Sequence, residues 1–224
     1  MSEEKFLIVS ATNIEIKPLL NSSNKISDNN FEAILNGHKV DIIITGVGIN
    51  AMTYAITKAI IKNNYKFIIL VGIAGSFNSQ HKIGSVVNVM SEEFSDLGVK
   101  TNNGFVDIFD MKLCNANEFP YSNKKLDNYT LINNHIINNL PPVSGSTVQT
   151  IISSSKSSIA TKTDVESMEG AAFFYCCMME KQAFIQIRSI SNFVGETDKA
   201  KWNIPLAVNN LNIIIRELFN EISS

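Results

Sequence analysis

The stretch KFIILVGIAGSF, residues 66–77, sets the fold class. Its first half is an unbroken apolar run, and the run passes into a turn that contains glycine. A run of this kind is typical of a strand buried on both faces, as in the parallel sheets of α/β proteins. Loops at the carboxyl ends of such strands are where these proteins form their sites, so the turn at 72–77 is the first place to look for function.

Similar apolar runs lie on both sides of this stretch and alternate with amphipathic segments. We expect further strands at 5–11, 39–48, 84–90, 141–151 and 183–193, and helices at 14–20, 49–62 and 204–222. The last helix has an apolar residue at every third or fourth position, which predicts one buried face. The alternation predicts a single α/β domain over 1–224 with a mostly parallel sheet.

Composition excludes several classes of protein. The 224 residues carry a net charge of −2, with no segment rich in lysine and arginine, so neither nucleic acid nor a membrane surface is an expected partner. No apolar stretch approaches the roughly 20 residues of a membrane span. The acidic start, MSEEKFLIVSA, lacks the basic residues of an export signal.

Cysteine and histidine usage favours a reduced cytoplasmic protein without a metal site. The cysteines are odd in number, and two are adjacent in an apolar segment: Cys114, Cys176 and Cys177. The three histidines lie far apart along the chain, with no paired spacing: His38, His81 and His135.

The segment GVGINA, residues 46–51, has the outline of a dinucleotide-binding fingerprint, because it follows a strand and opens a helix. That fingerprint also needs an acidic residue about 20 positions further on to bind the ribose. No Asp or Glu occurs between Ile42 and Ser91, so a nicotinamide cofactor is disfavoured. The glycines predict either a tight turn or the close approach of a smaller ligand.

A carboxylate lies within the apolar segment TDVESMEGAAFFYCCMMEK, residues 163–181. We expect a helix here, opened by a capping box of Thr163 and Glu166, with Glu169 inside it. Burying an unpaired carboxylate costs several kcal/mol, so Glu169 needs a partner. Arg188, inside the strand at 183–193, is an available structural partner, and a ligand is the alternative.

Three motifs together resemble the nucleoside phosphorylase and nucleosidase superfamily: VGIAGSF at 71–77, SMEGAAF at 167–173 and IRSISN at 187–192. Within it the chain is most similar to the futalosine hydrolases. That narrower resemblance rests on four stretches, ATNIEIKPLL (11–20), VVNVMSEEFSDLG (86–98), ESMEGAAFFYCC (166–177) and IQIRSISNFVGETDKAKWNIPLAVNNLN (185–212).

The resemblance implies a nucleoside phosphorylase-like fold, with a central mixed, mostly parallel twisted sheet flanked by helices. It implies hydrolysis of futalosine, a small-molecule nucleoside of menaquinone synthesis, to hypoxanthine and dehypoxanthine futalosine. No metal or organic cofactor is implied, and superfamily members commonly assemble as homodimers or larger oligomers.

Site residues carry over to matching positions. Glu15 resembles the carboxylate that activates water as general base. Glu169 would bind the ribose hydroxyls and Met168 would pack on the sugar. The remaining candidates for substrate binding are Ala74, Gly75 and Val148, together with Arg188 if it contacts the ligand rather than Glu169 alone.

Asn192 is where the sequence departs from adenine-specific nucleosidases, which carry Asp at this place. An amide can donate to N7 or O6 of a 6-oxopurine and accept from N1–H, so it suits hypoxanthine.

Three alternatives stay open. One is a methylthioadenosine/S-adenosylhomocysteine nucleosidase. Another is a purine nucleoside phosphorylase, disfavoured because residues 1–187 contain no arginine to hold phosphate. The last is a nucleoside-binding protein without turnover.

Overall fold

The computed structural model describes residues 5–102, 104–151, 163–196 and 198–222. Its strands are β1 (Phe6–Ser10), β2 (Asn24–Ser27), β3 (Asn30–Leu35), β4 (His38–Ile44), β5 (Phe67–Ser76), β6 (Val86–Phe94), β7 (Gly98–Thr101), β8 (Gly104–Asp107), β9 (Leu126–Asp127), β10 (Pro142–Thr147), β11 (Val165–Ser167) and β12 (Phe184–Phe193). Its helices are α1 (Lys17–Leu20), α2 (Ile49–Lys62), α3 (His135–Asn139), α4 (Gly170–Met179), a 3₁₀ turn (Lys199–Lys201) and α5 (Ile204–Glu221).

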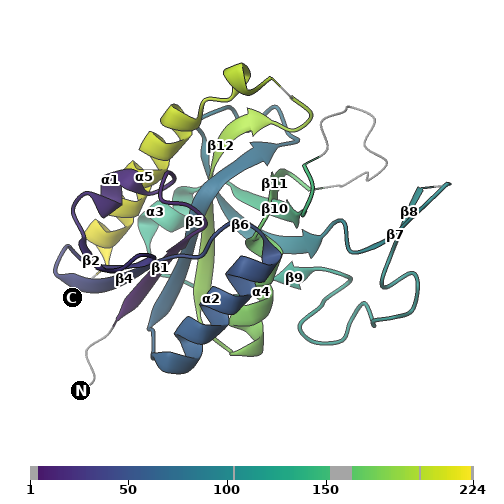
Figure 1. Cartoon of the computed structure of the whole chain (residues 1–224), viewed down its shortest axis with the longest axis horizontal. Helices are drawn as coiled ribbons and strands as arrows, with labels where there is room; N and C mark the ends of the chain where they lie inside the picture. The colour runs from purple at the N-terminus through teal and green to yellow at the C-terminus, as the bar shows by residue number, and fades with distance from the viewer. Residues whose placement is uncertain (1–4, 103, 152–162, 197, 223–224) are drawn as a thin grey trace.

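A mixed sheet runs through the centre of the molecule (Figure 1). Its strand order is β11-β10-β6-β12-β5-β1-β4-β3-β2, with β9 paired to β6. The central strands β4, β1, β5 and β12 are mutually parallel, as are β6, β10 and β11. Antiparallel pairing joins β12 to β6 and adds the β2–β3 hairpin at the edge, so the predicted α/β class and mixed sheet are confirmed.

The short strand β11 closes part of this sheet on itself. It pairs with β10 on one side and with β5 on the other, so β11, β10, β6, β12 and β5 form a ring. Closure brings the carboxyl ends of β5 and β12 next to the segment that leads into α4. The ring thus gathers three of the predicted motifs at one end of the sheet.

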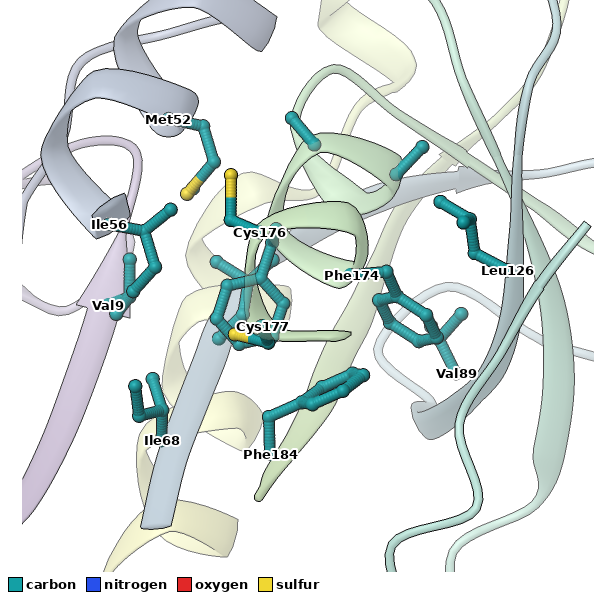
Figure 2. Close-up of a cluster of buried hydrophobic side chains, with 14 of the residues drawn as sticks. Val9, Met52, Ile56, Ile68, Val89, Leu126, Phe174, Cys176, Cys177 and Phe184 are labelled. Carbon is teal, nitrogen blue, oxygen red and sulfur yellow. The ribbon is translucent and has the colours of Figure 1, made fainter. Parts of the chain in front are cut away.

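Helices cover both faces of the sheet. On one face α2 and α4 pack together over an apolar cluster that includes Met52, Ile56 and Phe174, and Figure 2 shows these side chains converging with Phe184 and Val89 from the strands. On the other face α5 lies across the sheet beside α1 and α3 (Figure 1). It buries four residues of the apolar stripe predicted from its sequence, Val208, Leu211, Ile215 and Leu218, and also Phe219.

The major strands and the two long helices α2 and α5 lie where the sequence predicts them. The helix predicted at 14–20 is a single turn, α1, because Pro18 starts it late and Ile14 lies in the turn before it. The capping box of Thr163 and Glu166 is wrong: residues 165–167 form β11, and α4 begins at Gly170 with Glu169 as its N-cap. Glu169 therefore lies at the N-terminus of α4, as its N-cap, and not within the helix as expected.

Candidate active site

A cavity of about 260 Å³ opens at the carboxyl ends of β1, β5 and β12. Every candidate site residue predicted from the sequence except Arg188 lines it: Glu15, Ala74, Gly75, Val148, Met168, Glu169 and Asn192. These residues are up to 177 positions apart in the chain (Glu15 to Asn192), and the ring of strands brings them together. The wall combines apolar side chains with four carboxyl and amide side chains, those of Glu15, Glu166, Glu169 and Asn192, and with the hydroxyls of Thr12, Ser167 and Ser191.

The Glu15 side chain is held by four hydrogen-bond donors, from the end of β1, the residues just after it and β5. Its Oε2 accepts from the Thr12 amide (2.9 Å), the Thr12 hydroxyl (2.8 Å) and the Ser10 hydroxyl (3.2 Å). Among the described residues, Oε1 accepts from the Ile73 amide (3.0 Å) alone. An ionised carboxylate has about two acceptor positions on each oxygen, so Oε1 retains one for a further donor such as water. The carboxylate is thus oriented before any ligand arrives.

Gly72 leaves space for the side chains of Arg188 and Glu15. A Cβ on Gly72 would lie against Arg188 Nη1 and 2.7 Å from Glu15 Oε1, so any larger residue would displace both groups. Arg188 is 1% exposed and lies below the cavity wall, where its Nη2 is 3.8 Å from Glu169 Oε2. It is therefore placed as a neighbour of Glu169, away from the cavity surface.

The Glu169 carboxylate is buried at the N-terminus of α4. Its Oε1 accepts a hydrogen bond from the Gly48 amide at 2.9 Å. Burial raises the pKa of Glu169, and the charge of Glu15 raises it further, whereas Arg188 and the Gly48 N–H oppose the rise. A carboxylate in this position gains from additional donors at Oε2, which ribose hydroxyls can supply.

The glycine turn at 46–48 has a specific task in this arrangement. Gly46 and Gly48 adopt φ values of 89° and 94°, a backbone conformation that other residues rarely take. This conformation directs the Gly48 N–H toward Glu169, across the gap between the β4–α2 loop and α4. The tight turn that the glycines predict is present, and the close approach of a ligand stays a prediction.

Asn192 lies at an irregularity in β12. The pairing of β12 with β5 slips by one residue between Ile190 and Asn192, so that Asn192 is opposite Gly75. Bulges of this type re-aim side chains next to active sites. The Ser191 hydroxyl donates to Asn192 Oδ1 (2.7 Å), and Asn192 Nδ2 donates to the Phe193 carbonyl (3.1 Å), which leaves Nδ2 one free hydrogen. The amide accordingly presents a donor.

Several cavity residues were missed by sequence reasoning. Trp202 and Ile204, at the start of α5, line the cavity together with Val47 and Glu166. Trp202 had a signal, since it is the only tryptophan and lies in a distinctive stretch. Glu166 had none, because a helix was expected where β11 forms.

Other features of the described residues bear on the chemistry. Within them, no three His, Cys, Asp or Glu side chains are grouped closely enough to hold a metal ion. None of the helices in those ranges is long and apolar enough to cross a bilayer. Both arginines lie outside the cavity wall, and its described lining includes no lysine.

The chain is similar to known nucleosidases over most of its length, although no protein-family model matches it. The 5′-methylthioadenosine/S-adenosylhomocysteine nucleosidase of Psychromonas ingrahamii is 22% identical to it over 207 residues, in an alignment that covers 86% of each protein.

Two solved structures show the same likeness in three dimensions. The adenine complex of the methylthioadenosine/S-adenosylhomocysteine nucleosidase from Colwellia psychrerythraea 34H has a TM-score of 0.78 at 18% identity, covering 99% of this chain and 96% of that one. Futalosine hydrolase from Helicobacter pylori strain 26695 has a TM-score of 0.77 at 15% identity, covering 98% of each.

These comparisons establish the fold. It is the one shared by methylthioadenosine/S-adenosylhomocysteine nucleosidases and futalosine hydrolase, as the sequence motifs predicted. The relatives carry both names, so they leave the choice between the two substrates open.

Proposed function

We propose that the protein is a nucleosidase that hydrolyses the N-glycosidic bond of a 6-oxopurine nucleoside, with futalosine as the first candidate substrate. The observation that carries the proposal is the presence, in one cavity, of two buried carboxylates and an amide that presents a donor: Glu15, Glu169 and Asn192. Each suits a different part of the reaction.

Glu15 is the general base in this proposal. The unused acceptor position on Oε1 binds a water molecule and takes its proton as the oxygen attacks the anomeric carbon. The four donors around the carboxylate keep it from rotating away from the water. Preorganisation of this kind lowers the barrier because no rearrangement is needed during the step.

Glu169 binds the ribose. Its Oε2, 3.8 Å from Arg188 Nη2, accepts from the sugar hydroxyls, while Oε1 stays with Gly48. As the bond to the base breaks, positive charge develops on the sugar, and a fixed carboxylate nearby stabilises it. Met168 packs on the apolar face of the ring.

Asn192 stabilises the leaving base. Its free Nδ2 hydrogen donates to N7 or O6 of the purine, which receives the electron pair of the broken bond. The base then takes up a proton, and the sugar keeps the hydroxyl derived from water. The overall products are free hypoxanthine and the free sugar, dehypoxanthine futalosine, with a hemiacetal hydroxyl at its anomeric carbon.

Water is favoured over phosphate as the nucleophile. A phosphorylase needs cationic groups for a dianion. The described cavity lining has no lysine or arginine, and the Gly48 N–H already donates to Glu169.

Cleavage of methylthioadenosine or S-adenosylhomocysteine is the second candidate. It is favoured by the Psychromonas ingrahamii relative, which carries that name and aligns over 86% of the chain. Asn192 weighs against it, because an amide is a poorer proton donor to adenine N7 than a carboxylic acid.

A chromatographic product assay tests the proposal. Purified protein is incubated with futalosine, methylthioadenosine and inosine, each with and without phosphate, and Glu15→Gln serves as the control for contaminating activity. We expect hypoxanthine from futalosine at a rate independent of phosphate. Adenine from methylthioadenosine as the dominant product would support the second candidate, and a requirement for phosphate would overturn hydrolysis.

A further inference from the structure

Asn192 and Glu166 flank the same glycine in the sheet. Gly75 of β5 pairs with Asn192 of the parallel strand β12 and with Glu166 of the antiparallel strand β11. Residues paired in register on neighbouring strands point to the same face of a sheet. Asn192 and Glu166 therefore face one another across Gly75 at about 10 Å between Cα atoms, twice the usual strand spacing.

Gly75 allows Asn192 to lie close to β5. A Cβ on Gly75 would lie 3.2 Å from Asn192 Nδ2 and 2.9 Å from a methyl of Val194, so a larger residue would displace both side chains. Gly75, Asn192 and Glu166 all line the cavity. We call the part of the cavity beside Gly75 the slot; Asn192 and Glu166 place a hydrogen-bonding side chain on each side of it.

Asn192 alone cannot satisfy a 6-oxopurine. Its Oδ1 accepts from the Ser191 hydroxyl at 2.7 Å, and in this arrangement its remaining Nδ2 hydrogen donates to N7 of the base. The N1–H of a 6-oxopurine lies on the far side of O6 and needs an acceptor of its own. A buried donor left unpaired costs about 1–3 kcal/mol, so the slot needs a second polar group.

Glu166 has the properties of that group. No described residue donates a hydrogen bond to its side chain or forms an ion pair with it. It is half-buried, and burial together with the charge of Asp96 raises its pKa. A carboxylate in this situation is stabilised by an N–H donor from a ligand.

We propose that Glu166 accepts the N1–H of the purine base and thereby selects 6-oxopurines over adenine. The inference rests on the proposed function, because it places a base in the slot. Adenine carries a lone pair at N1 in place of N1–H, and that lone pair would face the carboxylate. A site built around a hydrogen bond rejects an analogue that cannot make it, and the repulsion adds to the loss.

Binding of free bases to Glu166→Gln tests this directly. Hypoxanthine and adenine are titrated calorimetrically into the wild type and the variant. The amide can donate to adenine N1, so we expect the preference for hypoxanthine to fall by about tenfold or more. Glu93→Gln is the matched control. Glu93 and Glu166 pair with Ser146 of β10 from its two sides, but Glu93 is not among the residues that line the cavity. A ratio within about twofold of the wild type in Glu166→Gln would overturn the proposal.

A second measurement uses the unaltered protein, so it does not depend on the variant folding. The base 1-methylhypoxanthine lacks N1–H, and we expect it to bind at least about tenfold more weakly than hypoxanthine. In Glu166→Ala the difference should shrink, because both the acceptor and the obstruction to the methyl group are gone. Equal affinity of the wild type for the two bases would contradict the assignment.

Failure of this proposal and failure of the proposed function give different results. A protein that cleaves futalosine yet shows an unchanged base preference in Glu166→Gln keeps its function and loses the role of Glu166. A protein that cleaves none of the nucleosides loses the proposed function. The affinities for hypoxanthine and 1-methylhypoxanthine still decide whether the slot accepts a hydrogen bond from N1–H.

Discussion

Arg188 and Glu169 are buried neighbours at 3.8 Å, and Glu169 accepts a shorter contact, a hydrogen bond from the Gly48 amide at 2.9 Å. The guanidinium is also 3.4 Å from the Ser167 hydroxyl and 3.5 Å from the Ile73 carbonyl. It therefore connects β5, through Ile73, with β11, through Ser167, just before α4 begins. Arg188 supports Glu169 from below and leaves Oε2 accessible to a ligand.

Replacing Arg188 with Met should destabilise the fold strongly. Removing one partner of a buried ion pair costs about 3–5 kcal/mol, because the other charge is left uncompensated. The pKa of Glu169 should rise further, since Arg188 is the largest influence that opposes the effect of burial. Urea unfolding measures the first effect, and the acid limb of the pH profile of kcat/KM should move to higher pH.

Arg216→Met is the control for that experiment. Arg216 lies on the exposed side of α5 and donates to the Pro18 carbonyl at 3.1 Å. Surface changes of this kind are usually within about 0.5 kcal/mol. An Arg188→Met protein as stable as Arg216→Met would contradict the importance of the buried pair.

Glu15→Gln should lower kcat by about 10²–10⁴, the usual contribution of a general base. The variant should also lose about 1–3 kcal/mol of stability, because an amide NH₂ would face one of the donors now satisfied by the carboxylate. Glu32→Gln on the exposed β3 controls for loss of charge. Near-normal turnover in Glu15→Gln would remove Glu15 from the chemistry, whatever its effect on stability.

Asn192→Asp should move the preference toward adenine nucleosides. The new side chain would lie 3.1 Å from the Phe193 carbonyl, a contact that only the protonated acid can make favourably. A protonated acid in that position can pass its proton to N7 of adenine. The ratio of kcat/KM for methylthioadenosine to that for futalosine should rise by at least about tenfold, with Asn209→Asp on the surface of α5 as the control. An unchanged ratio would argue against Asn192 as the contact to the leaving base.

Glu92 should make stability depend on pH in the direction opposite to most carboxylates. It is buried behind α4, where it accepts from Gln186 (2.7 Å) and Thr147 (2.9 Å). Burial raises its pKa from the usual 4.5 to about 7, so the folded protein holds this proton more tightly than the unfolded chain. Its contribution is present below pH 4.5 and is lost as the pH rises to about 7, at a total of about 3 kcal/mol.

The variant Glu92→Gln isolates the pH-dependent contribution of Glu92 to stability, because the amide cannot ionise. The free energy of unfolding of the wild type minus that of the variant, measured in urea from pH 4 to pH 8, should fall as the pH rises. Asp107 and Asp164 have lowered pKa values and act in the other direction, but they are present in both proteins and cancel. A flat difference across this range would show that Glu92 titrates normally.

The strands and the two long helices were predictable because each is a local pattern of apolar residues. The β2–β3 hairpin was not, since β2 is exposed throughout and β3 buries only Ala33 and Leu35, at the edge of the sheet. The start of α4 was misplaced because β11 is only 3 residues long, too short to show the alternation of a strand before the apolar helix begins.

Most cavity residues were predictable from motifs, but their arrangement was not. Glu166 became visible only when β11 proved to be a strand paired with Gly75, a long-range pairing that no local pattern encodes. The orientation of Asn192 depends likewise on Ser191 and on the slipped register of β12.

The Asn212 side chain on α5 donates to the carbonyl of Glu15, and Trp202 and Ile204 close one side of the cavity. A growing chain therefore cannot assemble the pocket until synthesis has passed residue 212, even though Glu15 is among the first residues made. We expect a nucleoside to bind tightly only to a chain complete to that point. A single proteolytic cut at the start of α5 should weaken binding while leaving every carboxylate of the site in the protein.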